Sequence, residues 1–134
     1  MIEFIMSEKP VILILDDLSA YVRALERVLR TEYEVRCALS IKEAEGMVEG
    51  AFAALVDIRL KEKETDNRDG LVFIQWLSEN YPDTISIAMS ALEDPGLDRE
   101  ALTAGARTFL AKPVRISALR ELLANFARVT NEKK

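Results

Sequence analysis

Residues 11–17 read VILILDD, a run of five apolar residues that is followed by two aspartates. The apolar run is too short for a helix and rich in β-branched side chains, which predicts a strand buried on both faces. Residues 52–56, FAALV, form a second run of this kind and lead directly into Asp57. Strands of this kind are typical of parallel sheets that are covered by helices on both sides. These two runs therefore predict the central strands of an α/β fold.

Shorter strands and amphipathic helices are predicted around these two runs. The further strands are expected at residues 33–37, 85–89 and 107–111, and the helices at 22–30, from 40 towards Gly50, from 69 to near Pro82, at 98–104 and through 119–126. Ser40 and Glu43 form a capping box at the start of the second helix, and Gly105 is placed as a C-terminal cap. Because the β-α pair occurs five times, the sequence predicts an α/β fold with a doubly wound, five-stranded parallel sheet.

The composition excludes several classes of protein. The chain has 134 residues, of which 49% are apolar and 31% charged, as expected for one compact domain and not for a disordered chain. A single cysteine excludes an internal disulfide, and the absence of histidine excludes imidazole zinc sites and Ser-His-Asp hydrolysis. Lys and Arg number 18 against 23 Asp and Glu, so a net charge of −5 gives no basis for direct nucleic-acid binding.

The ends of the chain carry no signal for membrane insertion or export. No apolar run approaches the ~20 residues of a membrane span, and the first residues lack the layout of a signal peptide. We therefore expect a cytoplasmic domain at residues 10–130, between an N-terminal extension at 1–9 and a C-terminal tail at 131–134.

Polar side chains follow four of the five predicted strands. In open α/β sheets, ligands bind outside the carboxyl ends of the strands. The residues expected at this edge are three carboxylates, a hydroxyl and an ammonium group: Asp16, Asp17, Asp57, Ser90 and Lys112. Taken singly, each is as readily explained as a turn residue, a helix cap or a solvated loop. Their coincidence at one edge of the sheet favours a functional site.

The chemistry of this set points to phosphoryl transfer. Three adjacent carboxylates repel one another unless a cation joins them, and oxygen ligands in an open site favour Mg²⁺. Mg²⁺ and a lysine together neutralise the charge on phosphoryl oxygens. A carboxylate held beside that pair can act as the nucleophile and become an acyl phosphate. The residues therefore predict phosphoryl transfer onto an aspartate.

Four segments of the chain resemble the motifs of response regulator receiver domains, which have the CheY-like fold. These segments are ILILDD (12–17), LVDIRL (55–60), IAMSA (87–91) and GARTFLAKP (105–113). The resemblance covers about residues 10 to 130 and implies a sheet with the strand order 2-1-3-4-5. It also implies a role for each matching residue: Asp57 as phosphoacceptor, Asp17 as direct metal ligand, Asp16 as ligand through water, the backbone carbonyl of Arg59 as a further ligand, Ser90 as switch hydroxyl, Lys112 as phosphate-binding lysine, Phe109 as switch aromatic and Pro113 in a cis bond.

The resemblance also implies partners. The phosphoryl donor would be a sensor histidine kinase or a phosphotransfer protein. A downstream effector would bind the face formed by the fourth helix, the fifth strand and the fifth helix, and a homodimer could form on phosphorylation. Two features differ from the usual pattern, because Leu60-Lys61 replaces a Met-Pro pair and residues 61–68, KEKETDNR, lengthen the next loop. We expect this charged loop to be mobile.

Two other functions are weighed against a phosphorylated receiver. A pseudo-receiver that only binds partners usually lacks acidic or lysine positions, and this chain has all of them. A haloacid-dehalogenase-like phosphatase needs a second aspartate two residues after its nucleophile, where this chain has Leu18 and Arg59. Nucleotide binding is disfavoured because the chain contains no Gly-x-Gly-x-x-Gly or Gly-Lys-Ser/Thr loop.

Overall fold

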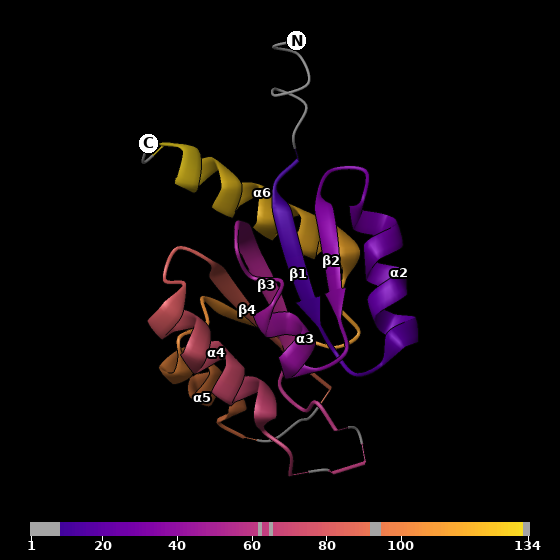
Figure 1. Cartoon of the computed structure of the whole chain (residues 1–134), viewed down its shortest axis with the longest axis vertical. Helices are drawn as coiled ribbons and strands as arrows, with labels where there is room; N and C mark the ends of the chain where they lie inside the picture. Colours follow the sequence, from indigo (N-terminus) through magenta and orange to yellow (C-terminus); the bar gives the residue numbers. More distant parts are fainter. Residues whose placement is uncertain (1–8, 62, 65, 92–94, 133–134) are drawn as a thin grey trace.

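Strands and helices alternate along the whole described chain (Figure 1). The computed structural model describes residues 9–61, 63–64, 66–91 and 95–132. The elements are β1 (Val11–Leu15), α2 (Ser19–Leu29), β2 (Glu34–Ala38), α3 (Ile41–Glu45), β3 (Ala51–Asp57), α4 (Asp69–Asn80), β4 (Ile85–Ser90), α5 (Leu97–Ala104), β5 (Thr108–Ala111) and α6 (Ile116–Glu132). The strands form one parallel sheet in the order β2-β1-β3-β4-β5, which confirms the predicted fold and strand order.

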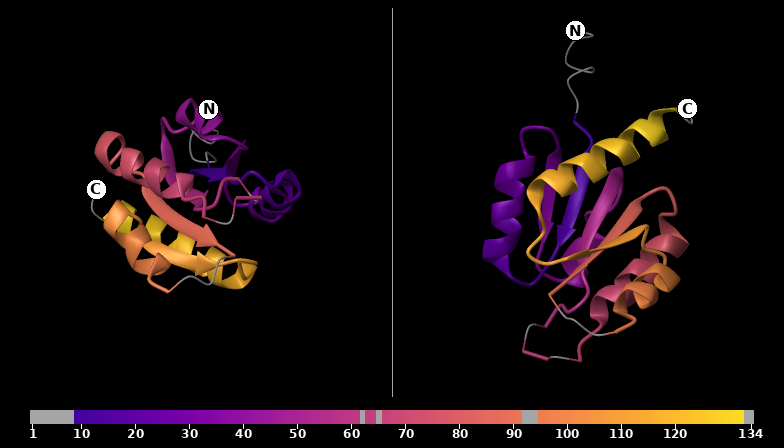
Figure 2. Two further views of the ribbon diagram at one scale, coloured as in Figure 1. Left: turned by 90° about the horizontal axis from the view of Figure 1, so that it is seen from below. Right: turned by 180° about the vertical axis from the view of Figure 1, so that it is seen from behind.

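The sheet separates two apolar layers, because successive side chains of a strand point to opposite faces. On one face, residues such as Ile12, Leu55 and Met89 pack with α2 and α6. On the other face, residues such as Leu13 and Val56 pack with α3, α4 and α5. We call these the α2/α6 layer and the α3/α4/α5 layer, and the two views of Figure 2 show them from different sides. None of the described helices is long and apolar enough to cross a membrane.

The ends of two helices show where the sequence patterns hold and where one fails. Ser40 Oγ accepts a hydrogen bond from Glu43 N–H at 3.2 Å, which confirms the predicted N-cap. The sequence predicts that this helix continues towards Gly50, but α3 ends at Glu45 with Gly46 at its C-cap, because glycine is a poor helix former. Gly105 caps α5 with a φ of 123°, a conformation that favours glycine.

The strand register brings the predicted site residues to one edge of the sheet. Asp57, the last residue of β3, pairs with Met89, and Ser90 pairs with Ala111 directly before Lys112. β1 ends beside β3 at the Leu15–Val56 pair, so Asp16 follows at the same edge. Figure 1 shows the arrowheads of β1 and β2 pointing towards this edge, where the loop after β3 also lies.

The two predicted chain ends lie partly outside the described residues. Of the predicted extension at 1–9, only Lys9 is described. At the other end, α6 continues to Glu132 and so enters the predicted tail at 131–134.

Candidate functional site

Three aspartates meet at the carboxyl end of the sheet. One carboxylate oxygen from each of Asp16, Asp17 and Asp57 lies within 4.8 Å of the others. The first two follow β1, and the third ends β3 in the centre of the sheet. Asp16 is fully buried, Asp57 is 3% exposed and Asp17 is half-buried. The predicted cluster is therefore formed, and the protein shields most of it from water.

Lys112 lies against this cluster. Its Nζ donates a hydrogen bond of 2.7 Å to Asp16 Oδ2 and lies 3.8 Å from Asp57 Oδ1. The other oxygen of Asp16, Oδ1, accepts a hydrogen bond from Leu18 N–H at 3.0 Å. Asp16 is thus held by two donors, while the ammonium group of Lys112 lies close to Asp57. The Lys112–Pro113 peptide bond is cis.

The electrostatics of the cluster favour the binding of a cation. Burial, and secondly the charge of Asp16, raise the pKa of Asp57 to about 7, although Lys112 opposes this shift. Burial alone would lower the pKa of Lys112, but its hydrogen bond to Asp16 and the charge of Asp57 raise it overall. Near neutral pH, Asp57 of the metal-free chain is therefore only partly ionised, and a divalent cation would displace the proton from the protonated fraction. Three converging carboxylates are suitable ligands for a hard ion such as Mg²⁺.

Ser90 ends β4 at the same edge of the sheet as the cluster, and Phe109 lies on the neighbouring strand β5. Ser90 is 1% exposed, and its carbonyl oxygen accepts a hydrogen bond from Lys112 N–H at 2.9 Å. Ala88 pairs with Phe109, and both belong to the α3/α4/α5 layer. Because Ser90 is two residues beyond Ala88, its side chain points to the same face. Phe109 is half-buried there.

The sequence model of the response regulator receiver domain matches residues 12–124. The chain belongs to this family. Receiver domains are signalling modules rather than classical enzymes, which disfavours the phosphatase alternative.

Among curated proteins, the response regulator protein PilR of Pseudomonas aeruginosa is 34% identical over 122 residues, which are 89% of this chain and 26% of PilR. The hydrogenase transcriptional regulatory protein HoxA of Bradyrhizobium diazoefficiens is 29% identical over 109 residues, 81% of this chain and 22% of HoxA. The chain thus spans about a quarter of the length of these curated relatives.

Solved receiver structures are also similar to this chain. The CheY-like receiver domain protein of Methanospirillum hungatei JF-1 has a TM-score of 0.78 and 25% identity, and the match covers 93% of this chain and 99% of that one. A response regulator of Burkholderia pseudomallei, solved with a phosphorylated aspartic acid, a calcium ion and citrate, has a TM-score of 0.75 and 27% identity. That match covers 93% of this chain and 73% of the other.

Gly70 is a feature of this receiver whose importance the sequence pattern does not show. A Cβ atom at this position would lie 2.1 Å from the carbonyl oxygen of Asp57 and 2.6 Å from the Cα of Ile58. Gly70 N–H donates to the carbonyl oxygen of Ile58 at 2.9 Å. The first turn of α4 is therefore packed directly against the backbone that carries Asp57, and only glycine leaves room for this contact.

Asn67 organises the long loop before α4 and is likewise missing from the sequence-based prediction. Its Oδ1 accepts hydrogen bonds from Leu60 N–H at 3.1 Å and from Asp69 N–H at 3.0 Å. Its Nδ2 donates to Asp69 Oδ2 at 3.1 Å and to Glu64 Oε1 at 3.2 Å. The expected mobility of residues 61–68 stays a prediction, and residues 62 and 65 of that loop lie outside the described part. Asparagine is favoured in such turns because it bonds nearby backbone, which is the signal that the sequence offers.

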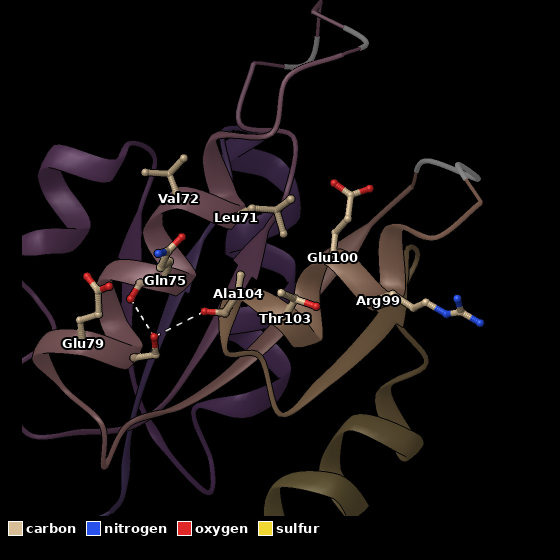
Figure 3. A pocket seen from close by; sticks show the side chains of 9 residues that line it. Leu71, Val72, Gln75, Glu79, Arg99, Glu100, Thr103 and Ala104 are labelled. Atoms are coloured by element: carbon tan, nitrogen blue, oxygen red, sulfur yellow. Dashed lines mark hydrogen bonds between the residues drawn. The ribbon is translucent and has the colours of Figure 1, made fainter.

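A groove of about 620 Å³ between α4 and α5 lies apart from this site (Figure 3). Ser78 Oγ bridges its floor by donating to the carbonyl oxygens of Gln75 at 2.8 Å and Ala104 at 3.4 Å. None of the three clustered aspartates, Ser90 or Lys112 lines it. The groove is therefore not part of the candidate phosphoryl site.

Asp17→Asn should separate metal binding from folding. Replacing one of three neighbouring carboxyl groups with a neutral amide relieves repulsion, so the metal-free variant should be at least as stable as the native chain. The same change removes a ligand, so the affinity for Mg²⁺ should fall by more than about tenfold. Urea unfolding with and without Mg²⁺ measures both effects. Asp83→Asn, at an exposed aspartate in the turn before β4, is a control for net charge. A clear loss of metal-free stability in Asp17→Asn alone would contradict this account.

Proposed function

We propose that this chain is the phosphoacceptor receiver domain of a two-component system, in which Asp57 accepts a phosphoryl group from a phosphohistidine. The donor would be a sensor histidine kinase or a phosphotransfer protein, and the chain would act in the cytoplasm. The observation that carries this proposal is that the side chains of Asp16, Asp17, Asp57 and Lys112 lie close together at the end of the central strand. Retention of all four groups favours a phosphorylated receiver over a pseudo-receiver.

The reaction needs an ionised Asp57. One of its carboxylate oxygens attacks phosphorus, a P–O bond forms, and the P–N bond to the donor histidine breaks with its electron pair leaving on the imidazole nitrogen. The product is an acyl phosphate on Asp57. Lys112, 3.8 Å from Asp57 Oδ1, is close enough to stabilise charge on the transferred phosphoryl oxygens. The chain would catalyse only this reaction and the later loss of its own phosphoryl group.

Mg²⁺ would be held by the carboxylates of Asp17 and Asp57, by Asp16 through water, and by the backbone carbonyl of Arg59. When bound, it would neutralise charge on the phosphoryl oxygens and the neighbouring carboxylates. Asp16 has a second role in this arrangement, because its hydrogen bond of 2.7 Å holds Lys112 beside the acceptor.

The signal would leave the site through Ser90 and Phe109. The Ser90 hydroxyl would donate a hydrogen bond to a phosphoryl oxygen, and the Phe109 ring would move inwards in response. The two residues share one face of the sheet, and a phenylalanine ring can enter that apolar layer without burying a hydroxyl. The face formed by α5, β5 and α6 would then bind an effector or a second copy of the chain. Residues 92–94, which follow Ser90 and Ala91 in the sequence, lie outside the described part.

Incubation with acetyl phosphate and Mg²⁺ tests the acceptor function. The chain should gain the mass of one phosphoryl group, labile to hydroxylamine and located at Asp57 by peptide mapping. A parallel incubation with excess chelator should give no gain, because the metal is needed to offset the charge of the site. An unchanged mass in the presence of Mg²⁺, with the chain folded, would support the pseudo-receiver alternative instead.

A further inference from the structure

Tyr21 connects α2 to the residues on both sides of Pro113. It lies in the first turn of α2, and its side chain is half-buried. Its hydroxyl oxygen accepts a hydrogen bond from Val114 N–H at 3.0 Å. Its ring centroid lies 4.5 Å from Lys112 Nζ. One side chain therefore contacts the phosphate-binding lysine and also fixes the backbone that follows it.

The contact between the ring and Lys112 is attractive and is shielded from water. The face of an aromatic ring carries partial negative charge and attracts an ammonium group, more strongly where water is excluded. The Lys112 side chain is only 9% exposed. Its other two partners, Asp16 and Asp57, are carboxylates whose charge would change when a metal binds or a phosphoryl group arrives. The ring is the partner whose attraction stays the same through those changes.

We propose that Tyr21 is a positioning residue for phosphoryl transfer, acting through Lys112. The ring carries this role by restricting the ammonium group to the vicinity of Asp57, whereas the hydrogen bond between the hydroxyl and Val114 N–H is a separate contact with the backbone. This role rests on the proposed phosphoacceptor function. An ammonium group stabilises a transferring phosphoryl group only from a defined position, so a lysine without this restraint should act less efficiently.

Two substitutions separate the ring from the hydroxyl. Tyr21→Phe keeps the ring and removes the acceptor for Val114 N–H, whereas Tyr21→Leu removes both. Phe126→Leu is the matched control, because Phe126 is a half-buried ring of the same α2/α6 layer with Arg107 Cζ 5.4 Å from its centroid. Phe126→Leu also removes a ring and a cation–π contact, but Phe126 lies on α6 and its ring contacts Arg107 in place of Lys112.

The experiment measures phosphorylation by acetyl phosphate with Mg²⁺ and the NMR shifts of the Lys112 Hε protons in the phosphate-free chain. Tyr21→Leu should lower the second-order rate constant about tenfold, whereas Tyr21→Phe and Phe126→Leu should stay within about twofold of the native chain. The ring-current shift of the Lys112 Hε protons should persist in Tyr21→Phe and Phe126→Leu and disappear in Tyr21→Leu.

The outcomes that overturn the proposal are distinct. A native rate in Tyr21→Leu excludes the positioning role, and so does an equal loss in Tyr21→Leu and Tyr21→Phe, which would assign the effect to the hydroxyl alone. An equal loss in Phe126→Leu would assign it to packing of the α2/α6 layer. If the native chain itself takes no phosphoryl group, the acceptor function fails first and the role of Tyr21 fails with it.

Discussion

Asp57→Asn is expected to take no phosphoryl group and, without metal, to be more stable than the native chain above neutral pH. The loss of phosphorylation follows because the amide cannot form the acyl phosphate. The gain in stability follows because the fold raises the pKa of Asp57 from 3.8 to about 7, mainly by burying it and secondly through the charge of Asp16. The folded chain therefore resists the ionisation that the unfolded chain undergoes freely.

The sign of the pH dependence follows from this shift. Below pH 3.8, Asp57 is protonated in both the folded and the unfolded chain, so it does not make the free energy of unfolding change with pH. Between 3.8 and about 7, the unfolded chain loses this proton while the folded chain keeps it, so folding becomes less favourable as pH rises. The contribution of Asp57 to stability is thus greatest at low pH and is lost through this window. The expected difference between the two chains at about pH 8 is on the order of a few kcal/mol.

Urea unfolding of both chains between about pH 4 and pH 8, in chelator, measures this difference. Plotted against pH, the free energies of unfolding of the native chain and of Asp57→Asn should be similar near pH 4 and should differ more as pH rises. Above neutral pH, Mg²⁺ should make the native chain more stable than Asp57→Asn, because it binds and stabilises the native chain, whereas the variant has one carboxylate ligand fewer. Asp83→Asn should follow the native curve. Parallel profiles for the native chain and Asp57→Asn would contradict the assigned shift.

Gly70→Ala is expected to destabilise the chain by more than about 3 kcal/mol, if it folds at all. The three atoms nearest to the added methyl group would all be backbone atoms: Asp57 O at 2.1 Å, Ile58 Cα at 2.6 Å and Asp57 C at 2.8 Å. Backbone at the end of a central strand cannot rotate away as a side chain could, so the first turn of α4 would have to move. Because this turn packs on the residue that carries the acceptor carboxylate, any folded fraction should also phosphorylate slowly.

Gly46→Ala provides the matched control for Gly70→Ala. Its new Cβ would meet nothing closer than Glu43 O at 3.7 Å, and its φ of −84° is open to any residue. This control should be neutral or slightly stabilising, because alanine restricts the unfolded chain. The comparison uses urea midpoints for both variants. A loss of less than about 1 kcal/mol in Gly70→Ala would show that α4 adjusts more easily than its contacts imply.

The sequence predicts the sheet and the acidic cluster because both depend on local patterns. Two apolar runs and three shorter strand patterns, each followed by a helical segment, predict parallel strands, and parallel strands place the residues that follow them at one edge. Asp16, Asp17, Asp57 and Lys112 therefore come together as expected. The strand order itself rests on the family resemblance, since the alternation of strands and helices does not determine it.

The missed residues depend on contacts that no local pattern encodes. Tyr21 looks like an ordinary residue of an amphipathic helix, and its partners at Lys112 and Val114 lie more than ninety positions away in the chain. Gly70 looks like a residue of a helix start, and only the fold shows its distance from Asp57 O. α3 is shorter than expected because Gly46 ends it after five residues, and the spacing of apolar residues does not show where so short a helix stops.

The separation of the core into two layers has an evolutionary consequence. The α2/α6 layer includes Val114 and packs against Tyr21, whereas the α3/α4/α5 layer includes Ala88 and packs against Phe109. Substitutions on opposite faces of the sheet share few partners, so their energetic effects should be nearly additive. A lineage can therefore remodel α5, the part of the proposed effector face that lies on the α3/α4/α5 side, for a new binding partner while the opposite face keeps the lysine in place. Conserved chemistry and divergent recognition can be inherited together because the sheet lies between them.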